Sequence, residues 1–212
     1  MRIVYLHGFA SGPSSSKAQF FRAKFAERGI AIEIPQLDQG HFEALTITGQ
    51  LSVIDRTVGG DETILMGSSL GGYLAALYAA RHSNIQRLIL LAPAFQFPSR
   101  WHARYTPEQL DQWKSRGSWP VFHYAYGREL DLGYELMDDS LLYEDEPQFT
   151  QPCLIFHGIK DPVVPIDLSR RMRDQHPNVS LVEFDSGHEL TDVLDLMWAQ
   201  VHSALGLPEI RP

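Results

Sequence analysis

One segment of the chain, Thr63-Ile64-Leu65-Met66-Gly67-Ser68-Ser69-Leu70-Gly71-Gly72-Tyr73, determines how the rest is interpreted. Its first four residues are an apolar run that predicts a buried strand. The residues from 70 to 80 are rich in Ala, Leu and Tyr and apolar almost all round, which predicts a buried helix. Between them lies the pattern G-x-S-x-G, centred on Ser69. A serine on a sharp strand-to-helix turn has a strained backbone, and residues larger than glycine two positions away would clash.

The same alternation of short apolar runs and helical patterns extends in both directions. We expect strands at about 3–6, 30–34, 63–66, 88–91, 153–156 and 179–184. We expect helices at about 16–28, 43–58, 70–80, 166–175 and 192–204. Such strands, separated by helices, are typical of a parallel sheet covered on both faces. The sequence therefore predicts an α/β fold with a mostly parallel sheet of about six strands.

Length, charge and cysteine content limit the alternatives. A chain of 212 residues fits a single domain, 1–212. The formal net charge of −8 argues against a nucleic-acid partner or an anionic membrane. We also expect no membrane span, because no run approaches the ~20 apolar residues that one needs. The chain reads from Met1 straight into a strand, with no signal peptide, and the single Cys153 cannot form an internal disulfide. These features favour a cytoplasmic protein of unknown oligomeric state.

The alternation stops between about residues 95 and 150, a segment that we call the cap. It shows no clear strand but holds many aromatic residues, among them Trp101, Trp113 and Trp119. It interrupts the chain between the fourth and fifth predicted strands, above the end of the sheet where ligands bind in such folds. We expect a helical, aromatic lid whose three tryptophans line a substrate pocket. Ordinary core packing would give a similar pattern, so both interpretations stay open.

Ser69 requires a base, because an unperturbed alcohol is a poor nucleophile at neutral pH. Among nine histidines, His188 directly follows the last predicted strand, in Asp185-Ser186-Gly187-His188. That position brings it to the same edge of the sheet as Ser69. His102 and His123, in the cap, could touch a substrate. Ser68 is a second serine in the motif, but it does not occupy the central position.

The imidazole of the base must be held in one tautomer by an acceptor. Asp161 follows the fifth predicted strand, so it reaches the same edge of the sheet on a third loop. The order Ser, Asp, His is the order that G-x-S-x-G enzymes of this kind use. Asp185 and Asp167 are the alternatives, and Asp-Pro also occurs as an ordinary turn.

Acyl transfer builds negative charge on the substrate oxygen, which backbone N–H groups can stabilise. We expect the N–H groups of Leu70 and Phe9 to form this oxyanion hole, with His7 ordering the loop that carries Phe9. The same loop does not match a phosphate-binding pattern, because Lys17 is displaced from the required place. No spacing of His, Cys, Asp or Glu suggests a metal site, and no cofactor is expected.

Four short motifs are similar to those of the small bacterial YqiA-like esterases, which belong to the α/β-hydrolase superfamily. They are Tyr5-Leu6-His7-Gly8-Phe9, Ile34-Pro35-Gln36-Leu37, Gly67-Ser68-Ser69-Leu70-Gly71-Gly72-Tyr73 and Gly187-His188. The resemblance covers roughly the first eighty residues and 153–188, while the cap does not match clearly. It implies an α/β-hydrolase fold that lacks the first two of the superfamily's eight strands. It also implies a triad of Ser69, Asp161 and His188, and short acyl esters as substrates.

The leading hypothesis is therefore a serine hydrolase that cleaves carboxylic esters through an acyl-enzyme on Ser69. A thioesterase, a lactonase or a small peptidase could use the same residues, because a fold does not choose among these reactions. A binding protein that kept the fold and lost activity is the alternative from another class. Such a protein would be expected to lack a triad residue or to have a disrupted serine motif, and neither feature is seen.

Overall fold

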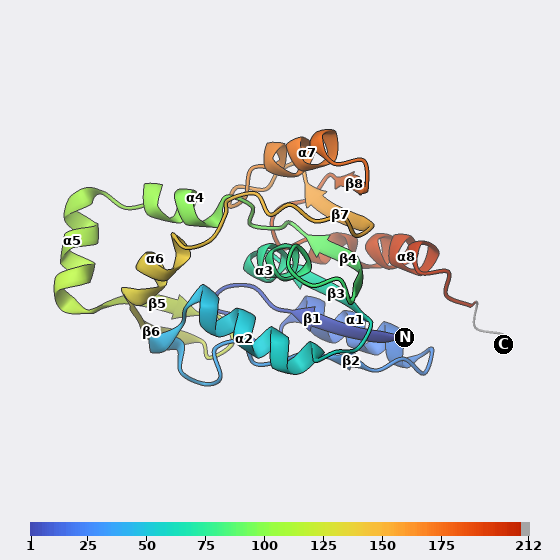
Figure 1. The fold of residues 1–212 in the computed structure, drawn as a ribbon, viewed down its shortest axis with the longest axis horizontal. Coiled ribbons are helices and arrows are strands. Elements are labelled where there is room, and N and C mark those ends of the chain that lie inside the picture. Colours follow the sequence, from blue (N-terminus) through green and yellow to red (C-terminus); the bar gives the residue numbers. More distant parts are fainter. Residues whose placement is uncertain (209–212) are drawn as a thin grey trace.

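A computed structural model describes residues 1–208, and a six-stranded sheet lies at the centre of this range (Figure 1). The strand order is β2-β1-β3-β4-β7-β8, and every neighbouring pair is parallel. The strands are β1 (Arg2–Leu6), β2 (Ile32–Glu33), β3 (Thr63–Ser68), β4 (Ile85–Leu91), β7 (Cys153–Gly158) and β8 (Val179–Phe184). The predicted parallel α/β sheet is confirmed. The predicted domain end at residue 212 lies outside the described residues.

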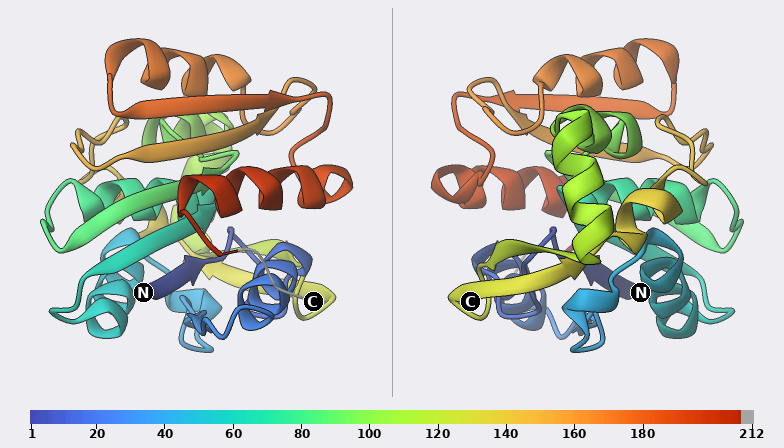
Figure 2. Two further views of the ribbon diagram at one scale, coloured as in Figure 1. Left: turned by 90° about the vertical axis from the view of Figure 1, so that its right-hand side faces the viewer. Right: turned by 90° about the vertical axis from the view of Figure 1, so that its left-hand side faces the viewer.

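Helices cover both faces of the sheet, as predicted (Figure 2). Side chains alternate along a strand, so Ile3 and Tyr5 face one apolar core while Val4 and Leu6 face the other. The first core is closed by α1 (Ser16–Ala26) and α8 (Leu194–Ala204). The second is closed by α2 (Ile47–Val58), α3 (Leu70–Ala79) and α7 (Ile166–Gln175). Because helices bury both faces of the sheet, the ends of the strands are the parts where a functional site can form.

The helix after β2 begins later than the sequence pattern predicts. Residues Phe42–Ala44 form a separate 3-10 turn, and α2 starts only at Ile47. The reason is local, because the Thr46 side chain accepts a hydrogen bond from the N–H of Gly49 and so caps the helix. A second 3-10 turn, Thr191–Val193, likewise replaces the predicted first turn of α8.

The cap contains three helices and, contrary to expectation, a β-hairpin. Its elements are α4 (Phe97–Ala103), α5 (Pro107–Arg116), β5 (Ser118–His123), β6 (Arg128–Gly133) and α6 (Glu135–Ser140). Strands β5 and β6 pair antiparallel with each other and stand apart from the main sheet. The prediction of a helical cap without strands was therefore wrong. Pro120 in β5 and the charged residues in β6 hide the strand pattern, because this hairpin is apolar on one face only.

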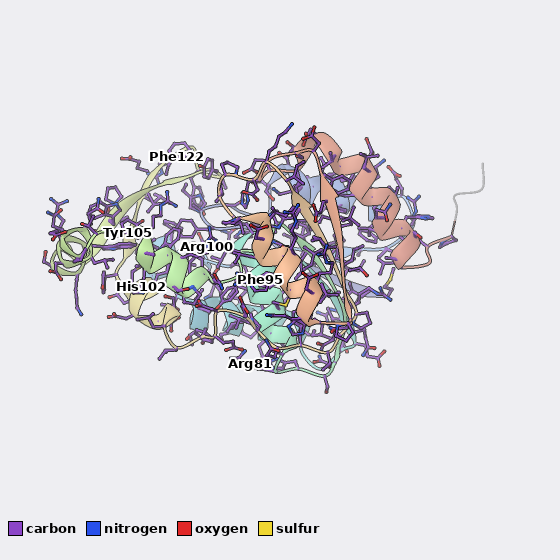
Figure 3. All side chains as sticks on the ribbon, turned by 90° about the horizontal axis from the view of Figure 1, so that it is seen from above. Arg81, Phe95, Arg100, His102, Tyr105 and Phe122 are labelled. Atoms are coloured by element: carbon purple, nitrogen blue, oxygen red, sulfur yellow. The ribbon has the colours of Figure 1, made fainter. Side chains whose placement is uncertain are left out.

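The cap lies beyond the carboxyl ends of the parallel strands, at the left of Figure 1. Arg100, His102 and Tyr105 follow one another along and just after α4, away from the sheet, while Phe122 lies on the hairpin (Figure 3). The N–H of Tyr124 donates a 2.8 Å hydrogen bond to the carbonyl of Ala10, which ties the hairpin to the loop after β1. No helix in residues 1–208 has the length and apolar character that a membrane span requires.

Candidate active site

Ser69 occupies a sharp turn between β3 and α3, with φ 53° and ψ −116°. L-residues rarely adopt this conformation, and it is typical of a nucleophilic serine at such a turn. The flanking glycines are required by close backbone approach. A Cβ on Gly67 would lie 2.3 Å from the carbonyl oxygen of Gly71, and a Cβ on Gly71 would lie 2.2 Å from that of Leu6. The G-x-S-x-G pattern is thus explained by the space available around the turn.

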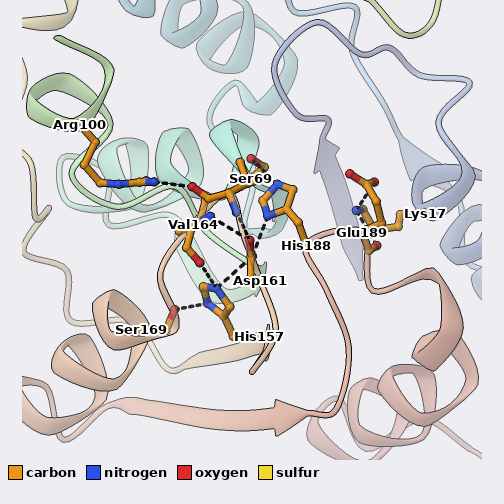
Figure 4. A network of polar contacts seen from close by, with 10 residues as sticks. Lys17, Ser69, Arg100, His157, Asp161, Val164, Ser169, His188 and Glu189 are labelled. Atoms are coloured by element: carbon orange, nitrogen blue, oxygen red, sulfur yellow. Dashed lines mark hydrogen bonds and ion pairs between the residues drawn. The ribbon is translucent and has the colours of Figure 1, made fainter. Parts of the chain in front are cut away.

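Three loops bring Ser69, His188 and Asp161 into one hydrogen-bonded line (Figure 4). The Nε2 atom of His188 is 3.1 Å from Oγ of Ser69, and its Nδ1 atom is 2.7 Å from Oδ2 of Asp161. A carboxylate only accepts, so Nδ1 carries the proton and Nε2 is left to accept from the serine hydroxyl. This is the tautomer that a general base next to a serine needs.

The Asp161 side chain is fully buried, yet hydrogen-bond donors surround its carboxylate. Its Oδ1 atom accepts hydrogen bonds from the N–H groups of Val163 and Val164, both at 2.8 Å. Its Oδ2 atom accepts from His188 and lies 3.2 Å from Nε2 of His157. Burial raises the pKa of the carboxyl group, but the hydrogen bonds from His157, His188 and Val164 outweigh it and hold the pKa below its usual range. Asp161 therefore stays ionised at neutral pH.

The two alternative acids make other contacts. Asp185 forms an exposed ion pair with Lys160 at 2.5 Å. Asp167 forms an exposed ion pair with Arg170 at 3.1 Å. Of the three candidate carboxylates, only that of Asp161 forms a hydrogen bond with His188 in the described structure.

The loop after β1 lies against Ser69. A Cβ on Gly8 would lie 3.5 Å from Cβ of Ser69. His7 orders this loop, as expected: its Nε2 atom accepts from the N–H of Leu37 at 3.2 Å, and Nδ1–H donates to the carbonyl of Gly8 at 2.9 Å. Burial lowers the pKa of His7, which favours the neutral ring that this pattern requires.

The N–H groups of Phe9 and Leu70 are the two predicted oxyanion donors. Among the hydrogen bonds formed by residues 1–208, neither N–H finds an acceptor. Leu70 is the first residue of α3, where the first N–H groups have no partner within the helix. Neither donor is therefore used within the described structure, as the predicted role requires.

The three predicted pocket tryptophans differ in position. The ring of Trp101 lies 4.8 Å from that of Phe9, at the loop beside Ser69. Trp113 is fully buried within the cap, where its Nε1–H donates to the carbonyl of Leu132 at 2.9 Å. The Trp119 ring packs 6.2 Å from that of Trp113. Among the aromatic contacts of the described residues, only Trp101 of the three pairs with a residue of the candidate oxyanion loop.

The two cap histidines are held by other parts of the chain. Nε2 of His102 is 3.0 Å from the carbonyl oxygen of Met137. His123 is buried, and its ring packs edge-on against Phe42 at 4.8 Å.

Sequence reasoning missed two polar residues around the site. His157 is the penultimate residue of strand β7 and faces Asp161. Lys17 lies on α1 with a nearly buried ammonium group, which donates to the backbone carbonyl of Glu189 at 2.7 Å, directly after His188. The only signal for His157 is a polar residue near the end of an otherwise apolar strand. Lys17 carries no such signal, because a lysine on a helix is ordinarily exposed.

Residues 2–204 match the model of a family described as an uncharacterised protein family, UPF0227. The chain belongs to UPF0227. The predicted resemblance to α/β-hydrolases is confirmed at the level of the fold, by the solved structures described below. No group of three or more His, Cys, Asp or Glu side chains that could hold a metal ion occurs within the described part of this UPF0227 chain.

Solved structures with the same fold include several hydrolases. Est1E from Butyrivibrio proteoclasticus with bound ferulic acid is 22% identical with a TM-score of 0.82, and the match covers 98% of this chain and 89% of that one. Mouse alpha/beta hydrolase domain-containing protein 10 is 20% identical, with a TM-score of 0.79 and coverage of 96% and 89%. A Paleococcus ferrophilus monoacylglycerol lipase is 16% identical, with a TM-score of 0.70 and coverage of 97% and 94%. At these identities the likeness establishes the α/β-hydrolase fold of this UPF0227 chain.

Proposed function

We propose that this protein is a serine hydrolase that cleaves carboxylic esters with short acyl groups. One observation carries the proposal: Oγ of Ser69, the ring of His188 and the carboxylate of Asp161 lie in a line with contacts of 3.1 and 2.7 Å. Nucleophile and base within hydrogen-bond reach, with the base oriented by a third group, are what nucleophilic catalysis by serine needs.

In the acylation step, Ser69 attacks the carbonyl carbon of the ester. Nε2 of His188 takes the serine proton as the Oγ–C bond forms, and the N–H groups of Phe9 and Leu70 stabilise the oxyanion. The ionised Asp161 stabilises the resulting imidazolium. His188 then gives its proton to the leaving alcohol, the ester C–O bond breaks, and Ser69 is left acylated.

Water completes the cycle. His188 removes a proton from a water molecule as that water attacks the acyl-enzyme, and the same two N–H groups donate hydrogen bonds to the oxyanion. The proton returns to Oγ of Ser69 when the bond between Ser69 and the acyl group breaks. The products are the free acid and the restored enzyme.

The preference for short acyl groups is supported by the resemblance to the YqiA-like esterases and by the aromatic wall beside Ser69. The Trp101 ring packs edge-on against Phe9 at 4.8 Å and stacks on Phe97 at 5.1 Å. These rings would line one side of the acyl pocket. Trp113 and Trp119 would support that wall through Tyr105, which lies 6.2 Å from Trp101 and 5.3 Å from Trp113.

Thioesters, lactones and small peptides remain alternative substrates, because all four reactions use the same attack. A panel of matched acyl groups on alcohol, thiol, lactone and amide leaving groups separates them. A feruloyl ester belongs in this panel, because ferulic acid is bound in the Est1E structure. The highest kcat/KM identifies the class, and a thioester rate far above the matched ester rate would contradict the ester assignment.

The decisive experiment compares Ser69→Ala with Ser68→Ala, its neighbour in the motif. We expect Ser69→Ala to lower kcat for a p-nitrophenyl short-chain ester by at least ~10³. We expect Ser68→Ala to retain most activity. A fluorophosphonate probe should label Ser69 of the wild type in a 1:1 ratio, whereas a binding protein without activity would stay unlabelled. Wild-type turnover by the Ser69→Ala variant would overturn the proposal.

A further inference from the structure

A second imidazole faces the carboxylate of Asp161 (Figure 4). Nε2 of His157 lies 3.2 Å from Oδ2 of Asp161, the same oxygen that accepts from Nδ1 of His188 at 2.7 Å. The His157 side chain is 0% exposed, so no substrate can reach it. The acyl-transfer steps proposed above do not use this ring. Its burial beside the acid needs a separate explanation.

The neighbours of His157 define which of its nitrogens carries a proton. Nε2 faces two acceptors, the carbonyl oxygen of Val164 at 3.0 Å and Oδ2 of Asp161 at 3.2 Å. A nitrogen between two acceptors must be a donor, so Nε2 is protonated. Nδ1 lies 2.7 Å from Oγ of Ser169 on α7, and the hydroxyl can donate to it. Ser169 is itself fully buried, which makes this arrangement the stable one.

We propose that His157 is a positioning residue, which holds Asp161 in place and divides the carboxylate's hydrogen-bonding capacity between two imidazoles. The proposal rests on the proposed function, because Asp161 must orient His188 for it to matter. His157 fixes the loop from Asp161 to Val164 at two points, the carboxylate and the carbonyl of Val164. It also withdraws part of the charge on Oδ2 from His188 and so moderates the strength of the base.

The other charged groups around this pair are further away or directed elsewhere. Arg100 of α4 donates to the backbone carbonyl of Val163, and Lys17 of α1 donates to that of Glu189. Both cations favour the charged form of Asp161 from a longer distance. Glu183 of β8 is paired with Arg170 at 2.7 Å. Of the ionisable side chains in residues 1–208, only His157 and His188 contact Oδ2 of Asp161.

The central test replaces His157 with Leu. Without the second donor, the carboxylate interacts more strongly with His188, and the protonated form of that base is stabilised. The acid limb of kcat/KM for a p-nitrophenyl ester should then move to higher pH by roughly half a unit. The looser loop should lower kcat on the order of 10- to 100-fold. KM should change little, because His157 cannot touch the substrate.

Two matched variants separate positioning from loss of packing. In His157→Gln, the amide N–H reaches about as far as Nε2, so we expect most of the kcat and the wild-type pH profile to return. Ile155→Val changes a fully buried residue on the same strand and the same face. We expect it to lower thermal stability without moving the pH profile. If His157→Leu does not fold, His157→Asn takes its place, because its shorter amide does not reach Asp161.

The outcomes distinguish this inference from the function on which it rests. A shifted pH profile in the Leu or Asn variant, with recovery in the Gln variant, supports the positioning role. A wild-type pH profile and kcat in the Leu or Asn variant would overturn it, whatever the change in melting temperature. Absence of fluorophosphonate labelling in the wild type would instead overturn the proposed function itself.

Discussion

At the scale of single residues, Asp161 is the group on which the site depends. Its carboxylate is surrounded by N–H donors, from Val163, Val164, His188 and His157, and a buried carboxylate tolerates such an environment only when it is charged. The same donors that keep Asp161 ionised hold it in one orientation. Activity and stability should therefore both respond when its charge is removed.

Replacing Asp161 with Asn tests the orientation of the base. The new amide would present N–H where Oδ2 now accepts, so Nδ1 of His188 would lose its acceptor and the ring would favour the other tautomer. We expect kcat for ester hydrolysis to fall on the order of 10³- to 10⁴-fold. Asp167→Asn, at the exposed pair with Arg170, is the matched control and should keep its rate. Equal rates for both variants would contradict the assigned role.

Acid should destabilise the protein partly through Asp161. Because the pKa of the folded state is held below its usual range, the carboxylate stabilises the fold above the unfolded pKa of about 3.9. This contribution is lost as the pH falls from there through the lower pKa of the folded state. Urea unfolding between pH 5 and 3 should show a smaller loss of stability in the Asp161→Asn variant than in the wild type. Parallel curves would argue against a depressed pKa.

Ser69, Asp161 and His188 were predictable because each lies within four residues of the end of a strand of recognisable pattern. Ser69, Asp161 and His188 come after β3, β7 and β8, and parallel strands end at one edge of the sheet. His157 was not predictable in the same way. A histidine at the end of an apolar strand is consistent with simple packing, and only the spatial arrangement shows that it faces the carboxylate.

At the scale of elements, the turn between β3 and α3 leaves no room for side chains at its glycines. Gly71 stands where β1 passes closest to α3, and a Cβ there would lie 2.2 Å from the carbonyl oxygen of Leu6. Alanine stabilises a helix by about 1 kcal/mol relative to glycine. This gain is smaller than the cost of moving the backbones of β1 and α3 apart.

We therefore expect Gly71→Ala to lower the free energy of unfolding by at least ~2 kcal/mol, measured by urea denaturation. The control is Gly60→Ala, where an added Cβ meets no atom within 4 Å. That variant should stay within about 0.5 kcal/mol of the wild type. A small effect at both positions would show that the turn can adapt.

The hairpin of β5 and β6 shows where prediction at this scale stops. Leu130 and Leu132 alternate with charged residues, and Gly127 supplies the positive φ of 64° for the turn. The signal is present but short, and Pro120 in the partner strand argues against a strand. Because β5 and β6 pair only with each other, they are not part of the regular alternation of strands and helices that predicted the main sheet.

At the scale of the whole molecule, aromatic contacts join the cap to the edge of the sheet that carries Ser69. The rings of Phe9, Trp101 and Tyr105 form a continuous series from the loop beside Ser69 into the cap. If this series limits the length of the acyl group, a gap in it should admit longer chains.

Trp101→Ala should raise the rate of an octanoyl ester relative to an acetyl ester by at least about 10-fold, since even one methylene group in an apolar pocket is worth about 1–3 kcal/mol. The measurement is kcat/KM across a series of p-nitrophenyl esters. Trp198→Ala removes a tryptophan from the core on the other face of the sheet, so it should lower stability while leaving this ratio unchanged. An unaltered ratio in Trp101→Ala would remove the cap from substrate selection.

The cap also leaves and rejoins the sheet at one place. The N–H of Gln96 donates to the carbonyl of Asp145 at 2.8 Å, and its side chain reaches Glu146 at the same distance. Because residues 96 and 145 are adjacent, the residues between them form an insertion with neighbouring ends. Insertions, deletions or a transplanted segment could therefore change this part of the chain while the ends of the strands keep their positions. Evolution, or an engineer, could in this way change what this segment contacts without rebuilding Ser69, Asp161 and His188 beneath it.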